Sequence, residues 1–403
     1  MTLPQAKFKE EKIVTDGGYY ISCLPSGAGL KPALSAVQFS GGVPQNISGA
    51  YFSKSINVHF LFTDDGLYFT RNNKVFVKIA PDLTNPFGFE FIYEDKPCAG
   101  IYTGNGVLRY TEEKFSTTPV SAPICAGALH CGRLFAIDRQ DNNKLLWSAA
   151  GSFNDWSHDL DKGGYLLLDP ERGNVLNILS FNGKLVLVRE YGLTVINMFG
   201  SPENYATGIT DTSCEKIYKN TAVVAEGKLI FFTQTGLCAF DGSRIIRLEH
   251  RNARDILNGF CAVGFAGNYI LACESAALQR KVLLCYRIAD GESYIIDCEA
   301  EALLASDAVY VYGNGNVKRL EEGNFEYTAE RLDFGTHKNK TLTKITFKGG
   351  ADMEVTCGDK TRVYVGAEGI VRPRMRGKYF DVKITGSAAV KDIVAKAEVS
   401  VGI

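Results

Sequence analysis

Two segments of this chain share a pattern and begin 44 residues apart. NGKLVLVREYGLTVI begins at Asn182 and EGKLIFFTQTGLCAF begins at Glu226, with Gly, Lys, Leu and a later Gly-Leu at matching positions. In each segment two short apolar runs flank a turn at a glycine, Gly192 in the first and Gly236 in the second. Short apolar runs around a glycine turn are typical of a β-hairpin.

Five further segments repeat this hairpin pattern. They are HFLFTDDGLYFT, GIYTGNGVLRY, GRLFAIDRQDNNKLLWS, YILACESAALQRKVLLCY and AVYVYGNGNVKRL. Several of the turns contain Asp-Gly or Asn-Gly, which allow the positive φ angles of tight hairpins. The hairpins recur about every 35 to 50 residues, a spacing that suits a four-stranded propeller blade.

A repeated hairpin needs neighbours because one hairpin cannot bury both of its faces. Blades stacked around an axis bury them against one another. We therefore expect Leu185, Leu187, Leu229 and Phe231 to be buried between blades. The alternative is a pair of β-sandwiches whose hairpins are similar by chance.

The hairpin pattern stops near Phe325, and a different part of the chain follows. Alternating apolar and polar residues at 344–347 and 379–382 predict a small antiparallel β-sandwich. From residue 326 onward there are 14 Lys and Arg against 10 Asp and Glu, a net of +4; the whole chain is -1, so residues 1–325 carry -5.

The predicted fold is therefore all-β: a β-propeller of about six to seven blades over 51–325, followed by a C-terminal β-sandwich over 326–403. Residues 1–50 are rich in Gly, Pro and Ser and are interpreted as an extended N-terminal arm, able to donate a strand that closes the ring. We expect the sandwich to be an assembly or docking domain, without which the propeller can fold.

Composition favours an ordinary soluble protein in a reducing compartment. Hydrophobic residues make up 45% and charged residues 22%. No run of 18 apolar residues is present to span a membrane, and the start lacks the apolar core of a signal peptide. The 11 cysteines form no C-x-x-C pair, so we expect free thiols rather than disulfides or a zinc site.

The sequence lacks the usual catalytic motifs. There is no P-loop, G-x-G-x-x-G, H-E-x-x-H or G-x-S-x-G. His130 and Cys131 lie beside an apolar run and are interpreted as packing residues. Asp155, Asp159 and Asp161 occupy one loop but do not follow the calcium-loop pattern. We predict no catalytic, cofactor-binding or metal-binding residue, and interpret the chain as a protein other than an enzyme.

One basic cluster is a candidate contact site. Arg372, Arg374, Arg376 and Lys378 alternate along the chain. In an extended strand such positions point to one side, where they form a row facing phosphates or an acidic partner. The alternative is a solvated edge strand protected by charge.

A family resemblance appears between residues 127 and 403. KLLWSAAGSFNDW and YLLLDPERGNVLNILSFNGKLVLVREYGLTVI resemble a segment typical of bacteriophage virion propellers. The tail RLDFGTHKNKTLTKITF, with RGKYFDVKITG, resembles the sandwich that closes such proteins. The relatives are tail nozzle or tubular tail proteins of short-tailed phages, and DNA-stabilisation proteins that plug the tail.

This resemblance implies a structural role in the virion, after assembly in the host cytoplasm. The expected partners are further copies of the chain in a ring, neighbouring tail or connector proteins, and DNA that passes without specific binding. A carbohydrate- or receptor-binding propeller is the second interpretation, although the only tryptophans are Trp147 and Trp156, too few for a site in every blade. A propeller hydrolase is the third.

Overall fold

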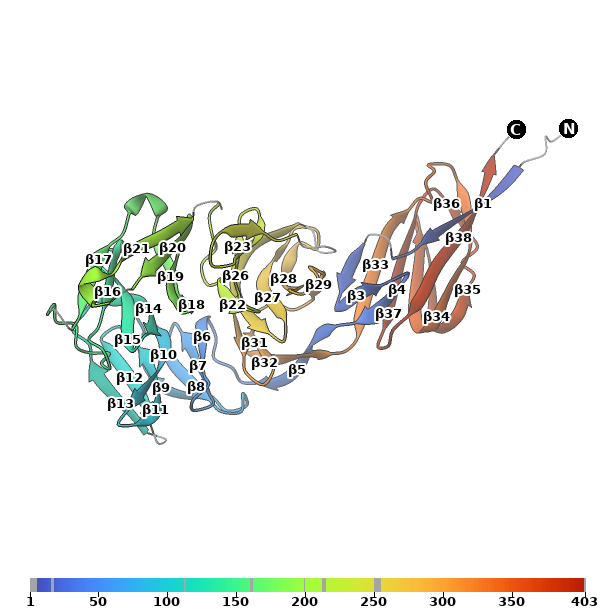
Figure 1. Ribbon diagram of the computed structural model, residues 1–403. Helices are drawn as coiled ribbons and strands as arrows, with labels where there is room; N and C mark the ends of the chain where they lie inside the picture. The colour runs from blue at the N-terminus through green and yellow to red at the C-terminus, as the bar shows by residue number, and fades with distance from the viewer. Residues whose placement is uncertain are drawn as a thin grey trace.

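The computed structural model describes residues 6–15, 18–111, 114–159, 162–198, 200–211, 215–249 and 255–401. Within these residues the regular structure consists of 38 strands and two single turns of 3-10 helix, η1 (Pro170–Arg172) and η2 (Pro202–Asn204). Figure 1 shows two parts, a propeller and an elongated second domain that combines blue N-terminal strands with orange to red C-terminal strands. The all-β prediction is confirmed.

The seven predicted hairpins form the two middle strands of seven four-stranded units. In chain order the pairs are β7 (Val58–Thr63) with β8 (Gly66–Thr70), β11 (Lys96–Tyr102) with β12 (Gly106–Thr111), β15 (Arg133–Asp138) with β16 (Lys144–Trp147), β19 (Lys184–Arg189) with β20 (Gly192–Asn197), β23 (Lys228–Thr233) with β24 (Gly236–Phe240), β27 (Asn268–Ser275) with β28 (Arg280–Arg287), and β31 (Val309–Gly313) with β32 (Asn316–Glu322).

An inner strand precedes each hairpin and lies towards the centre of the ring. The inner strands are β6 (Ile47–Ser53), β10 (Phe87–Tyr93), β14 (Ile124–His130), β18 (Val175–Phe181), β22 (Val223–Ala225), β26 (Ile256–Phe265) and β30 (Ala302–Ala305). The last of them, β30, contacts the first, β6, so the ring is closed. The propeller is thereby confirmed, and the alternative of two sandwiches is wrong.

An outer strand completes each blade. Six outer strands follow their hairpins directly: β9 (Val77–Ala80), β13 (Lys114–Pro119), β17 (Gly164–Leu167), β21 (Ala206–Asp211), β25 (Ile245–Arg247) and β29 (Ser293–Ile296). In the seventh blade the outer strand is β5 (Leu34–Gly41), which pairs antiparallel with β32. The N-terminal part of the chain therefore closes the blade formed by residues 302–322.

The core of the propeller lies between neighbouring blades. Leu185 and Leu187 pack in one cluster with Phe135, and Leu229 and Phe231 pack in the next cluster with residues of β19 and β20. All four predicted core side chains are completely buried. Their predicted burial is therefore confirmed.

The second domain combines strands from both ends of the chain. Its C-terminal strands are β33 (Phe325–Leu332), β34 (Lys340–Cys357), β35 (Lys360–Val371), β36 (Met375–Gly377), β37 (Phe380–Gly386) and β38 (Lys391–Val401). Strand β1 (Ala6–Ile13) pairs with β38, and β2 (Tyr19–Ile21) pairs with β33 and, in parallel, with β29 of the propeller. The short hairpin β3 (Cys23–Ser26) and β4 (Gly29–Pro32) packs beside them.

The N-terminal residues thus differ from the single arm expected over residues 1–50. Residues 6–32 form strands of the second domain, whereas residues 34–41 belong to the propeller. Val14, Tyr20 and Leu30 share one buried core with Ile345 and Val382 of the C-terminal strands. The partners lie more than 300 residues away in sequence, so no local pattern could indicate this pairing.

Candidate functional site

The strongest candidate contact surface is an unpaired edge of the second domain. Strands β35 and β36 run along one side of β34, while β37 and β38 occupy its other side. Within the described part of the chain, neither β35 nor β36 pairs with any other strand. We call residues 360–378 the free edge.

The predicted basic row lies on this free edge. Arg372, Arg374, Arg376 and Lys378 are all exposed. The residues between them are less exposed; Val371, Pro373 and Met375 are buried and Gly377 is half-buried. No ion pair links the four basic side chains to any described carboxylate. The four charges are therefore available to a partner. Of the four residues only Arg376 lies within a strand, and Arg374 has a positive φ of 47°, so they do not lie on one extended strand as predicted.

Apolar side chains are exposed on the same edge. Val363 is 63% exposed, Val365 81% and Ile370 37%. A bulge interrupts the pairing of β35 near Gly366, whose N–H donates to Asp352 Oδ1 at 2.6 Å. Bulges protect an edge strand against backbone pairing with other chains. A partner would therefore bind the free edge through its side chains rather than by adding a regular β-strand to it.

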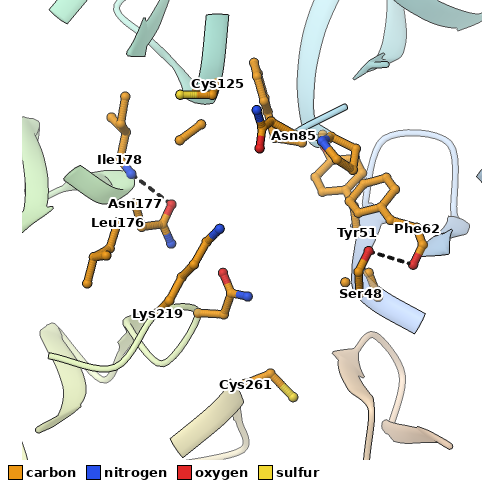
Figure 2. Close-up of a pocket in the computed structure, with 18 of the residues that line it drawn as sticks. Ser48, Tyr51, Phe62, Asn85, Cys125, Leu176, Asn177, Ile178, Lys219 and Cys261 are labelled. Carbon is orange, nitrogen blue, oxygen red and sulfur yellow. Dashed lines mark hydrogen bonds between the residues drawn. The ribbon is translucent and has the colours of Figure 1, made fainter. Parts of the chain in front are cut away.

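A second candidate site is the central channel of the propeller, a cavity of about 1140 Å³. The inner strands of the blades surround it (Figure 2). Small side chains from five inner strands or the residues just before them keep it open: Ala50, Gly127, Ala222, Ala262 and Ala302. Polar side chains also line it, among them Asn85, Arg139, Asn142, Asn177 and Lys219. No sequence pattern singles out these residues, because they come from different blades.

The other residues considered from the sequence have local roles. His130 is buried, and its Nδ1 lies 2.9 Å from Ser180 Oγ; burial lowers the pKa of the imidazole. Asp155 Oδ1 accepts hydrogen bonds from Ser157, and Asp159 lies 3.4 Å from Lys162 Nζ. Asp161 lies outside the described residues. Among the residues that are described, no group of three or more His, Cys, Asp or Glu is arranged to hold a metal ion.

Ten cysteines are free among the residues that the structure describes, and burial raises the pKa of the Cys285 thiol to about 12. The Cys285 thiol is therefore neutral at physiological pH. The described residues include no helix long and apolar enough to cross a membrane.

Comparison with known proteins shows similarity at the level of the fold. No protein-family model matches the chain, and no curated protein matches it. Among solved structures, virginiamycin B lyase from Staphylococcus aureus is 10% identical, with a TM-score of 0.49 over 71% of this chain and 99% of that one.

Two further solved structures are similar to the same extent. The Pan2 WD40 domain of Neurospora crassa is 8% identical, with a TM-score of 0.49 over 71% of this chain and 94% of that one. PorZ of Porphyromonas gingivalis is 10% identical, with a TM-score of 0.49 over 88% of this chain and 58% of that one. At such identities the likeness concerns the propeller fold and says nothing about function.

Proposed function

We propose that this chain is a structural subunit of a bacteriophage tail and that it works by assembling with copies of itself and with neighbouring tail or connector proteins. The observation that carries the assembly part of this proposal is the free edge. It combines exposed valines with four unpaired basic side chains on a domain that extends away from the propeller (Figure 1). The tail part rests on the sequence resemblance of residues 127–403.

The charge distribution supports contact between copies. Residues 326–403 carry +4 and residues 1–325 carry -5. A basic edge that meets the acidic part of the next subunit makes a head-to-tail contact, and such a contact generates a ring when its rotation closes. Exposed apolar residues of the free edge supply burial in such a contact, and its charges set orientation and association rate.

The overall charge is compatible with a conduit for DNA. Tight non-specific binding of DNA requires many Lys and Arg contacts with phosphates. A chain with a net charge of -1 gives a ring that surrounds DNA without holding it strongly. In the proposed role, DNA passes through the ring of subunits during ejection.

The test is sedimentation velocity of the full chain and of two edge variants. The first variant is Arg372→Ser, Arg374→Ser and Arg376→Ser together, and the second is Val363→Ser with Val365→Ser. We expect the unchanged chain to sediment as an oligomer and both variants to shift towards monomer. Their thermal melting should remain cooperative, because all five side chains are exposed.

A matched control removes three exposed basic residues from the propeller: Lys54→Ser, Lys184→Ser and Arg244→Ser. This variant has the same change in net charge and should still form the oligomer. An unchanged chain that stays monomeric at every concentration would contradict the proposal. Loss of the oligomer in the control as well would show that net charge, rather than the free edge, controls assembly.

A further inference from the structure

The channel of the propeller contains a lysine whose neighbouring backbone is anchored by hydrogen bonds. Lys219 lies in the segment before β22, and Figure 2 shows its side chain extending towards the open centre of the cavity. The neighbouring backbone is anchored: Tyr218 N–H donates to Phe232 O at 3.0 Å, and Ala262 N–H donates to Asn220 O at 3.0 Å. Asn220 has a positive φ of 62°. Within the described residues, no ion pair is found for Lys219.

The amide side chains beside this lysine present hydrogen-bond donors. Asn177 Oδ1 accepts the backbone N–H of Ile178 at 2.8 Å, so its NH₂ group remains to face the cavity (Figure 2). Asn142 Oδ1 accepts the weak Sγ–H donor of Cys125 at 3.8 Å. Both amide oxygens are therefore engaged. Arg139, which also lines the cavity, adds a guanidinium with five donors.

Two of the carboxylates around the cavity already have donors of their own. Glu301 accepts the backbone N–H of Ile47 at 2.8 Å and that of Asn314 at 3.2 Å. Glu90 accepts Ser53 Oγ–H and the N–H of Ser55, both at 3.1 Å. Asp64, on the turn between β7 and β8, is the third carboxylate of the lining.

The thiols of the cavity add no negative charge. Burial raises the pKa of Cys125, with Lys219 and Arg139 acting against this rise and Asp138 adding to it, and burial raises the pKa of Cys261 to about 12. Both thiols are therefore neutral at physiological pH. The Arg139 N–H donates to Pro123 O at 2.7 Å and Asn142 contacts Cys125, so the loop that carries Arg139 and Asn142 lies beside Cys125.

We infer that the propeller channel binds the carboxylate or phosphate group of a small polar ligand, with Lys219 and Arg139 as the charged donors and Asn142 and Asn177 as the neutral donors. The free groups of these four side chains are donors, and an anionic group carries only acceptors. Cations that lack a carboxylate partner can pair with such a ligand without first breaking an ion pair. This site is independent of the free edge and of assembly.

The test is isothermal titration calorimetry of the full chain with four probes: glucuronate, glucose 6-phosphate, inorganic phosphate and, as the neutral match, glucose. We expect at least one anion to bind and glucose to give no signal. If only glucuronate binds, the group that the channel recognises is a carboxylate. If glucose 6-phosphate or inorganic phosphate binds, the recognised group is a phosphate. Absence of binding by all three anions would overturn the inference.

The variants Lys219→Gln and Arg139→Gln test whether the anion binds in the channel. Each should weaken its binding about tenfold or more, because each removes a charge-assisted hydrogen bond. Lys184→Gln is the control, since Lys184 is exposed at the hairpin between β18 and β19 and does not line the channel. Binding unaffected by both channel variants, or weakened equally by the control, would also overturn the inference.

Discussion

At the scale of single residues, the molecule depends on large side chains buried between blades. Phe231 is completely buried and contacts a cluster that includes Phe181 and Val186 of the preceding blade. We predict that Phe231→Ala lowers the free energy of unfolding by about 3–5 kcal/mol, because it removes an aromatic ring and leaves a cavity. Chemical denaturation measures this change.

The control for this substitution is an exposed apolar residue. Ile92 is 73% exposed. Ile92→Ala should change the free energy of unfolding by less than about 0.5 kcal/mol. A loss below about 1 kcal/mol for Phe231→Ala would show that the strand does not form part of the core.

Acid sensitivity also belongs to this scale, through His59. Its Nδ1 lies 2.9 Å from both Asn73 Oδ1 and Tyr312 Oη, and its Nε2 lies 3.0 Å from Ser306 Oγ. It therefore links the first blade to the last. Burial lowers the pKa of the imidazole from its ordinary value of 6.5, while Asn73 and the charge of Asp307 act in the opposite direction.

The sign of the pH effect follows from the lowered pKa of the folded state. The unfolded chain binds a proton at a higher pH than the folded chain, so this contribution to stability is complete above about pH 6.5 and decreases as the pH falls below it. We predict a lower melting temperature at pH 5 than at pH 7, and a smaller difference for His59→Gln. His130, whose pKa is also lowered by burial, acts in the same direction. An identical pH profile for His59→Gln would contradict this role.

At the scale of elements, strand β5 closes the ring. It pairs with β32 along its whole length: Leu34 lies opposite Glu322 at one end, and Gly41 lies opposite Asn316 at the other. The pairing therefore joins positions that are almost 300 residues apart in sequence. Neighbouring residues of an antiparallel strand direct their N–H groups to opposite sides. Replacing both Ala36 and Val37 by proline therefore removes at least one N–H from the ladder.

We predict that this double proline variant melts several degrees below the unchanged chain, because the seventh blade loses its outer strand. Differential scanning calorimetry measures the shift. The matched control places proline at Lys78 and Ile79 of β9, an outer strand formed by local sequence. Equal shifts in the two variants would mean that β5 is an ordinary outer strand without a closing role.

The elements also show what the sequence could and could not reveal. The hairpin from Lys228 to Phe240 was predictable because its turn and its apolar runs lie within a few residues. The pairing of β1 with β38 was not, because the partners are close only in space and β1 reads AKFKEEKI, a largely charged strand. No local sequence pattern marks Lys219 and Asn177 as residues of one site, because only ring closure brings them to the same cavity. The exposure of Arg372 and Arg376, by contrast, agrees with their alternation in the sequence.

At the scale of the whole molecule, the second domain forms around strands from both termini. The end of the hairpin pattern near Phe325 predicts that a chain ending there folds. In the structure, that chain keeps Val14, Tyr20 and Leu30 but loses the C-terminal strands that cover them. We predict that residues 1–325 aggregate, because exposed apolar surface of this kind associates without specificity.

A chain limited to residues 33–324 is the informative counterpart. It keeps all seven blades and β5, and it lacks both halves of the second domain. We expect it to be more soluble than residues 1–325 and to melt cooperatively, which light scattering and circular dichroism measure. A soluble, cooperative chain 1–325 would show that the second domain is not needed to cover the N-terminal strands.

Electron microscopy of the purified full chain shows whether the chain works by assembly through its second domain. We expect rings of identical subunits, each with a propeller joined to an elongated domain as in Figure 1. The rings should be lost when Arg372, Arg374 and Arg376 are replaced by serine. Fields of single, separate propellers at every protein concentration would contradict assembly through the second domain.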